Sequence, residues 1–194
     1  MKKLLIILFA FVGTVQAQDN FFSVTYGMGM PTAKTADFVS DYSWRGVNLE
    51  WKKMKTDNVG IGLTMGWNVF NDFVEKGSFT EGTRTVTANQ YRYVNAFPVL
   101  ANVTYYLDPD ASVIPFGTIG MGTYRIIQRN EFGAFLLEEK NWHFGLYPEA
   151  GIILPTYGGA DIFFSTRYNY AFQAGDASWD HSWLGFNVGI SYWH

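Results

Sequence analysis

The feature that most constrains this chain is a period-two alternation between large apolar residues and residues that are glycine or small and polar. In residues 59–69, VGIGLTMGWNV, every odd position is large and apolar and every even position is Gly, Thr or Asn. Successive side chains of a β-strand point to opposite faces, so we predict a strand with one apolar and one small face. Small side chains on the second face suit the crowded lumen of a narrow barrel, whereas a soluble sandwich would place charged residues there.

Similar alternation recurs through the chain and defines eight candidate strands. They are residues 22–30, 42–51, 59–69, 90–107, 114–127, 142–154, 161–172 and 184–192. Single-chain bacterial membrane barrels have an even number of strands. We therefore expect an all-β fold, a closed antiparallel transmembrane β-barrel of eight strands in up-and-down meander order. Closure is required because each unpaired backbone group at a strand edge in lipid costs several kcal/mol.

Two details of side-chain facing are specific predictions. Trp44 shares the phase of Glu50, which places its side chain in the lumen. Phe116 breaks the alternation of its own segment, and a β-bulge near Pro115 would restore the phase.

The connections between the candidate strands alternate in length. Three are short and rich in turn formers: Lys52–Asn58, Asp108–Ser112 and Pro155–Ala160. Four are longer and more polar: Pro31–Asp41, Asn71–Asn89, Gln128–Asn141 and Ala174–His181. Short periplasmic turns and long outer loops are typical of outer-membrane barrels. Apolar residues in the second and third loops indicate either a binding surface or strands that extend above the bilayer, and we favour the second.

The N-terminus predicts export. Lys2 and Lys3 precede an apolar run at Leu4–Val12, and small residues follow at Val15–Ala17. The run is too short to cross a membrane, which takes roughly 20 residues, and it matches a cleaved signal peptide. We expect residues 1–17 to be the signal and residues 18–194 to be an outer-membrane β-barrel domain of a Gram-negative cell. The sequence contains no cysteine, so no disulfide is expected.

Four stretches carry a resemblance to a known group of proteins. AFPVLANVTYYL (96–107), PEAG (148–151), RYNYAF (167–172) and LGFNVGI (184–190) resemble small outer-membrane β-barrel proteins of Bacteroidetes. These are described as porin-family or OmpA/OmpX-like barrel-domain proteins. The resemblance extends from about Phe21 to the C-terminus. It implies an outer-membrane barrel, and it implies no particular function, because the group shares no catalytic motif.

Charged residues on the predicted lumen faces form the candidate site. They are Glu50, Arg92, Glu149 and Arg167, and His143 could join them. A buried charge is costly unless it is paired, so we expect acids and arginines to pair. One interpretation is a plug that fixes strand register, and the other is a gate that opens when ion pairs exchange partners. Large side chains expected in the lumen favour the plug: Trp44, Tyr106, Tyr147 and Phe163.

Catalytic, metal and cofactor sites are not expected. His181 and Ser182 are the nearest approach to a hydrolase set, but adjacent strand residues point to opposite faces. We therefore predict a non-enzymatic outer-membrane protein with a largely filled lumen, in an envelope-support or surface-binding role. The alternatives are a narrow channel for small or apolar solutes and, more distantly, a lipid A-modifying enzyme.

The expected partners follow from the predicted location. They are outer-membrane lipids and lipopolysaccharide, the barrel-assembly machinery during biogenesis, and an unknown ligand at the outer loops. The net charge is −3 and no basic stripe is present, so nucleic acid is not an expected partner.

Overall fold

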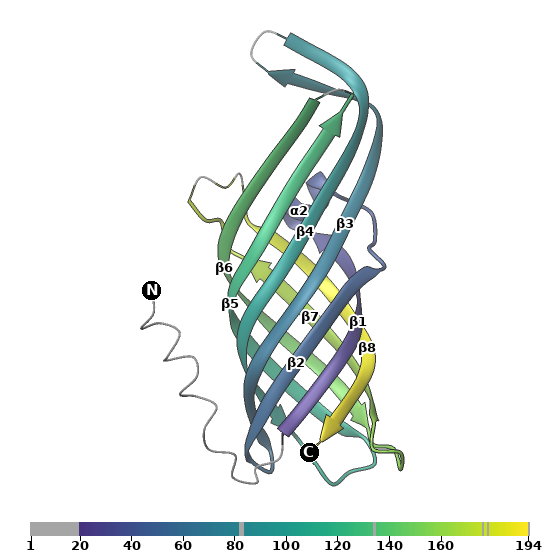
Figure 1. Cartoon of the computed structure of the whole chain (residues 1–194), viewed down its shortest axis with the longest axis vertical. Helices are drawn as coiled ribbons and strands as arrows, with labels where there is room; N and C mark the ends of the chain where they lie inside the picture. Colours follow the sequence, from purple (N-terminus) through teal and green to yellow (C-terminus); the bar gives the residue numbers. More distant parts are fainter. Residues whose placement is uncertain (1–19, 82–83, 134, 176, 178, 194) are drawn as a thin grey trace, which may run out of the picture.

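The computed structural model describes residues 20–193 apart from 82–83, 134, 176 and 178, so the predicted signal at 1–17 lies outside the described residues. Eight strands, each paired with its sequence neighbours and β1 with β8, form a closed antiparallel barrel (Figure 1). The strands are β1 (Asn20–Thr32), β2 (Arg45–Thr56), β3 (Val59–Glu81), β4 (Arg84–Tyr106), β5 (Ile114–Phe132), β6 (Phe135–Leu154), β7 (Asp161–Ala171) and β8 (His181–Trp193). The predicted all-β, eight-stranded meander is confirmed.

One short helix, α2 (Ala33–Phe38), follows β1 within the segment predicted as the first loop. It is tied to the last strand, because the backbone N–H of Ser182 donates to the Thr35 hydroxyl at 2.9 Å. Within the described part of the chain, no helix has the length and apolar character that a membrane crossing needs.

The predicted turn at Lys52–Asn58 is wrong in extent. Strand β2 continues to Thr56, and only Asp57 and Asn58 form the turn. The alternation continues through the two lysines: Lys52 is fully buried in the lumen, whereas Lys53 is half-buried on the opposite side of the strand. A lysine can continue the lumen face because a neighbouring carboxylate pairs with it.

Two predicted loops, Asn71–Asn89 and Gln128–Asn141, are mostly strand. The β3–β4 and β5–β6 hairpins continue through them, so strands β3 to β6 rise well above the others (Figure 1). The interpretation that these segments extend the strand wall is confirmed. We call residues 70–81, 84–94, 128–132 and 135–139 the protruding sheet.

Both specific predictions of facing are wrong. Trp44 precedes the first residue of β2, is 63% exposed, and packs edge-on against the Tyr42 ring at 5.0 Å. Phe116 needs no bulge, because β5 pairs in continuous register with both neighbours. Its side chain lies in the lumen, on the same face as Ile114 and Thr118. Large aromatic residues in this chain therefore occupy the lumen as well as the outer wall.

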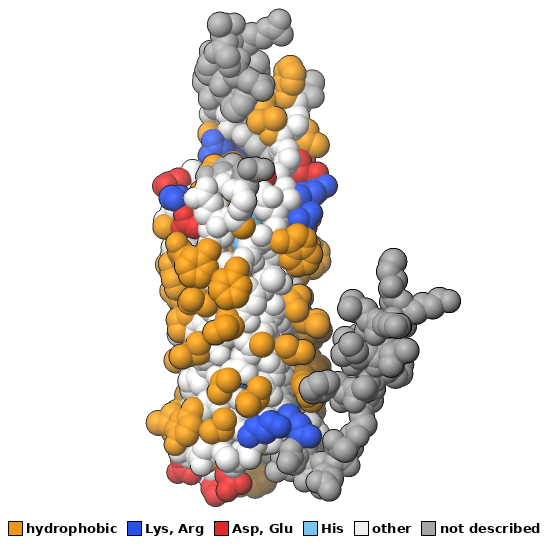
Figure 2. Space-filling view, turned by 90° about the vertical axis from the view of Figure 1, so that its left-hand side faces the viewer, with side chains coloured by type: hydrophobic (Ala, Val, Ile, Leu, Met, Phe, Trp, Pro, Cys, Tyr) orange, Lys and Arg blue, Asp and Glu red, His pale blue; other side chains and the backbone are white. Residues whose placement is uncertain are grey.

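The outer face of the barrel carries a broad apolar band, and charged side chains gather toward its two ends (Figure 2). On β4 the band runs from Tyr105, near the turn end, to Phe97. A tilted strand advances only about 2.5 Å per residue along the barrel axis, so a band of this length matches the apolar belt of membrane barrels, about 25 Å tall. On the loop side the outward apolar residues are interrupted by polar ones, which we call the outer rim: Arg45, Asn71, Asn95, Arg125 and Lys140.

Candidate functional site

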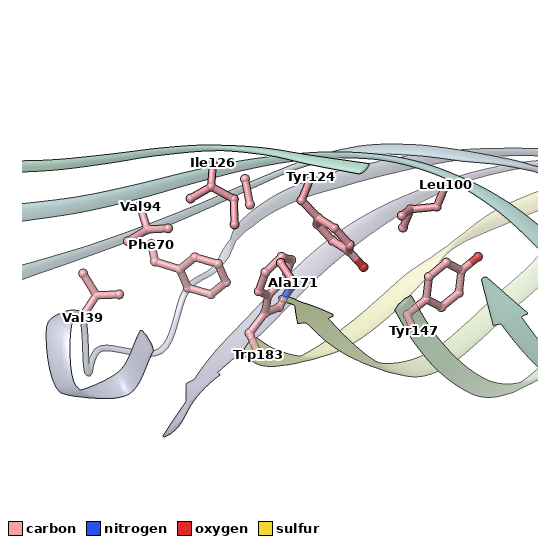
Figure 3. Packing of buried hydrophobic residues seen from close by; sticks show 10 residues of the cluster. Val39, Phe70, Val94, Leu100, Tyr124, Ile126, Tyr147, Ala171 and Trp183 are labelled. Atoms are coloured by element: carbon pink, nitrogen blue, oxygen red, sulfur yellow. The ribbon is translucent and has the colours of Figure 1, made fainter. Parts of the chain in front are cut away.

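The lumen is filled by side chains in three layers. A loop-side cluster of apolar residues lies toward the protruding sheet (Figure 3): Val39, Phe70, Val94, Ala96, Leu100, Tyr124, Ile126, Tyr147, Ala171 and Trp183. A turn-side cluster lies toward the short turns: Phe21, Met54, Tyr106, Ile114, Phe116, Ile153 and Phe163. Between them a polar belt holds the buried charges and amides: Asn48, Glu50, Lys52, Thr64, Asn102, Glu149, Ser165, Arg167 and Asn187.

The Glu149 carboxylate organises one half of the belt. The Arg167 guanidinium donates to one of its oxygens at 2.8 Å, and the Ser165 hydroxyl donates to the other at 2.5 Å. The chain of bonds continues as the Asn187 amide donates to Ser165 and the Asn48 amide donates to Asn187, each at 3.0 Å. These five residues come from strands β6, β7, β8 and β2, so the bonds tie together walls that are far apart in sequence.

The Glu50 carboxylate organises the other half. The Thr64 hydroxyl and the Asn102 amide donate to one oxygen at 2.9 and 3.1 Å, and Lys52 Nζ lies 2.9 Å from the other. The ammonium group of Lys52 also faces three rings of the turn-side cluster, with Nζ 4.9–5.7 Å from the ring centroids of Phe21, Phe116 and Tyr106. A carboxylate and ring faces together stabilise a buried cation.

Tyr147 joins the two halves of the belt. Its hydroxyl lies 2.9 Å from Thr64 Oγ1, and its ring lies beneath the Arg167 guanidinium, 4.3 Å from ring centroid to Cζ. Since the Thr64 hydrogen goes to Glu50, the Tyr147 hydroxyl is the donor in their bond. The buried charges are therefore connected in one network, which holds two acids and two cations.

Lumen glycines make room for the large rings. A Cβ on Gly120 would come within 2.2 Å of the Tyr147 ring, and one on Gly151 would come within 2.6 Å of the Phe116 ring. A methyl group at either position would collide with a ring that cannot move aside in a packed interior. Glycines at these two positions thus leave the space that two of the lumen aromatics fill.

Arg92 and His143 lie outside this network. Arg92 is half-buried near the loop end, where it donates to the Gln90 side chain at 3.0 Å and to the Phe38 carbonyl at 3.2 Å. His143 is buried higher in the lumen; its Nδ1 donates to the Phe172 carbonyl at 2.9 Å, and its ring meets the His181 ring edge-on at 5.3 Å. The expected pairing of Arg92 with Glu50 or Glu149 is wrong, because the position of Arg92 on β4 is too far from the belt along the strand.

Lys52 is the charged residue of the network that sequence analysis missed. Because Lys52 lies two residues after Glu50, its side chain points to the same face of the strand, the lumen. This spacing is the signal from which the sequence could have predicted it. The pair of adjacent lysines, followed by turn-forming residues, indicated a turn instead.

The turn end of the barrel is hollowed. A cavity of about 900 Å³ opens there, lined by turn residues such as Asp57, Asp108 and Asp110 and by Ile114 and Trp193. Its floor is the turn-side cluster, to which Ile114 belongs and against which Trp193 packs. The cavity therefore stops at apolar side chains below the polar belt.

The structure also locates the residues considered for hydrolysis. The Ser182 hydroxyl accepts from Thr32 Oγ1 at 2.8 Å and donates to the Thr32 carbonyl at 3.2 Å. Its hydrogen-bonding capacity is thus used by β1 and not by His181. Among the described residues, no three His, Asp or Glu side chains are grouped as metal ligands would be.

No protein-family model and no curated protein matches the sequence. Solved structures do match over most of the chain. OprG of Pseudomonas aeruginosa is 15% identical with a TM-score of 0.59, covering 92% of this chain and 97% of its own. Ail of Yersinia pestis, in complex with the heparin analogue sucrose octasulfate, is 13% identical with a TM-score of 0.55, covering 92% and 100%.

The outer-membrane protease OmpT of Escherichia coli also matches, at 9% identity and a TM-score of 0.55, covering 94% of this chain and 99% of its own. Proteins with different activities thus share this architecture, and at such identities the likeness concerns the fold alone. The chain therefore has the fold of the small bacterial outer-membrane β-barrels.

Proposed function

We propose that this protein is an integral outer-membrane protein of a Gram-negative cell, exported by a cleaved signal at residues 1–17, whose filled barrel anchors a surface-binding sheet. The outward apolar band supports the membrane location, and the interlocked polar belt supports a rigid, non-conducting anchor. The observation that carries the proposal is the contrast between a lumen closed by side chains and a large sheet that stands clear of the barrel.

The competing function is a narrow channel for small or apolar solutes, and the continuous polar belt is the feature that favours it. Apolar clusters close the belt at both ends, so solutes would have to displace Tyr147 and Trp183 on one side and Tyr106 and Phe116 on the other. An eight-stranded interior is just wide enough for side chains to fill. We therefore expect no conduction.

Planar-bilayer recording of the refolded protein tests this choice. We expect no discrete conductance steps above the bare bilayer, either in the unsubstituted protein or in Glu149→Gln and Arg167→Gln. Steps that change in size or frequency in these variants would establish a gated channel instead. An unchanged lipid A mass spectrum on deletion and overexpression is the result expected of a non-enzymatic protein.

The binding surface is the protruding sheet. Pairing of β2 with β3 ends at Arg45 and Val69, and pairing of β7 with β6 ends at Ala171 and Gly145. Beyond these pairs, β3 is still paired with β4 and β6 with β5, but among the described residues no strand pairs with the opposite edge of β3 or of β6. A sheet edge presents backbone groups that can accept a strand of another protein, and apolar residues on it add contact area.

The chemistry of the sheet favours a protein partner. Phe135, Leu136 and Leu137 are exposed on β6, and the charges nearby have both signs, with Arg129 and Lys140 paired to Glu138. Ail is seen with a polysulfated heparin analogue, but balanced charges give such an anion little attraction. We infer a protein segment that adds to the β6 edge.

Surface binding is tested with the Leu136→Lys variant in cells that display the protein. A lysine on an exposed edge opposes strand addition and removes apolar contact. We expect Leu136→Lys to lower adhesion of the cells to immobilised serum proteins, and Leu136→Val, which keeps strand propensity, to preserve it. Equal adhesion by cells lacking the protein would remove the surface-binding role.

A further inference from the structure

The outer wall of the barrel carries a groove on its lipid-facing side. It lies between β2 and β3 at the outer rim, has a volume of about 400 Å³, and is lined by Arg45, Gly46, Val47, Trp67 and Val69. This volume is at the lower end of the range for small-molecule binding sites, about 300–1,000 Å³. Apart from the arginine, the side chains that line it are apolar.

The groove exists because Trp67 turns away from β2. Its ring stacks on Phe97 of β4, with ring centroids 5.9 Å apart and planes 10° apart, and its Nε1 donates to the Asn95 side chain at 3.2 Å. The neighbour across the ladder on the other side is Val47, which is too small to fill the space. The hollow is therefore fixed by a stacked pair and a hydrogen bond.

Arg45 supplies a positive charge at the loop-side end of this groove. It is the first residue of β2, is exposed, and shares the outward face with Val47. The ion pairs among the described residues leave Arg45 without a carboxylate. Arg125, also at the outer rim, is instead placed over the Trp142 ring, with Cζ 5.6 Å from the ring centroid.

We propose that this groove is a binding site for a phosphorylated glycolipid of the outer leaflet, of the lipid A type. One acyl chain lies along Val47, Trp67 and Val69, and a phosphate accepts hydrogen bonds from the Arg45 guanidinium. The positions of the charged and apolar residues along the groove fit such a lipid. Arg45 is at the height of the lipid headgroups, and the apolar lining continues from there toward the bilayer centre. This inference rests on the outer-membrane orientation proposed above.

Native mass spectrometry of the refolded protein in detergent tests the site, with bisphosphorylated lipid A as the probe. We expect one lipid A per chain to be retained most tightly. Arg45→Gln should weaken its retention about tenfold, which is the loss of one charge-assisted bond to phosphate. Val69→Phe fills the groove and should weaken retention while Arg45 stays in place.

Two comparisons separate this site from general attraction at the rim. Arg125→Gln removes an outer-rim cation that does not line this groove, and the variant should retain lipid A as the unsubstituted protein does. Phosphatidylglycerol, which also carries a phosphate, should compete poorly. Normal retention in Arg45→Gln or in Val69→Phe, equal loss in Arg125→Gln, or equal competition by phosphatidylglycerol would each overturn the proposal. Conductance or adhesion failures would overturn the proposed function and leave this titration unaffected.

Discussion

The polar belt and the protruding sheet each contain a short arginine–glutamate pair, and the two pairs differ in their surroundings. In the belt, Arg167 and Glu149 lie 2.8 Å apart with side chains that are 5% and 0% exposed. In the sheet, Arg129 and Glu138 lie 2.6 Å apart with side chains that are 43% and 22% exposed. The shorter pair is the one in contact with water. Distance alone therefore does not rank their contributions.

Solvent decides the difference. Water screens the exposed pair and hydrates either partner when the other is removed, so such pairs contribute little. The buried pair has lost its hydration and depends on Ser165 and Tyr147 to complete its contacts. Removing one buried partner leaves an uncompensated charge, whereas removing one exposed partner leaves a hydrated one. The same chemistry thus holds the polar belt rigid and leaves the protruding sheet adaptable.

The largest expected effect is that of Glu149→Gln. The substitution keeps the shape of the side chain but leaves the Arg167 guanidinium without its carboxylate, which should lower the free energy of unfolding by about 3–5 kcal/mol. Urea unfolding in lipid, followed by the gel mobility of folded and unfolded forms, measures it. The double variant Glu149→Gln with Arg167→Met should recover part of the loss. A single variant as stable as the parent would contradict the belt's structural role.

A smaller loss is expected when the lumen is overfilled. In Gly120→Ala the new methyl group meets the Tyr147 ring, and we expect a loss of about 1–3 kcal/mol in unfolding free energy. Gly117→Ala on the same strand is the matched control, because its Cβ would meet nothing within 4 Å. The same urea titration compares them. Equal stabilities would show that the lumen is less tightly packed than the rings indicate.

The strands were predictable from sequence, whereas their ends were not. Alternation of large apolar residues with small or polar ones marks the wall strands, since one face meets lipid and the other meets lumen side chains. At Asn71–Asn89 the residues become polar where the wall leaves the apolar band, yet backbone pairing in the hairpin continues. At Trp44 the reverse occurs, and the alternation continues past the point where pairing stops. The hydrophobicity of a segment indicates whether its side chains face lipid or water. It does not indicate where the backbone hydrogen bonding of a strand ends.

The belt was predictable only in part for a related reason. The alternation of side chains along each strand places Glu50, Glu149 and Arg167 in the lumen. It does not predict which of these side chains are in contact. The bond between Asn48 and Asn187 joins strands that both flank β1, and it depends on closure of the barrel. Contacts across a lumen follow from the relative stagger of all strands, which no single segment encodes.

The exposed pair gives the sharpest contrast with the belt. We expect Glu138→Gln to leave the urea midpoint unchanged within error, because Arg129 stays hydrated when its partner is neutral. Raising the salt concentration should likewise leave the urea midpoint of the parent unchanged. Salt screens the exposed pair, which contributes little, and screening ions do not reach the buried pair. A midpoint shift as large as that of Glu149→Gln would show that the sheet and the belt unfold together through this contact.

A local effect is expected at the tether between α2 and the segment before β8. Lys34 Nζ donates to Asp180 at 2.6 Å, and this bond lowers the pKa of the Asp180 carboxyl below its ordinary 3.8 and raises the pKa of Lys34 above 10.5. A carboxyl with a lowered pKa contributes stability above its unfolded value and loses it as the pH falls through the folded value. The lysine contributes below 10.5 and loses its share as the pH rises through its folded pKa.

The tether should therefore hold from about pH 4 to beyond pH 10 and loosen in acid. Hydrogen-exchange protection of the α2 amides measures it: protection in the parent should fall between pH 6 and pH 3, by less than any effect on the belt. Asp180→Asn should be less protected at pH 6 and lack the acid-dependent fall. If the variant keeps the same pH dependence as the parent, α2 is held by the Thr35 contact to β8 instead, and the Lys34–Asp180 pair contributes nothing to holding α2.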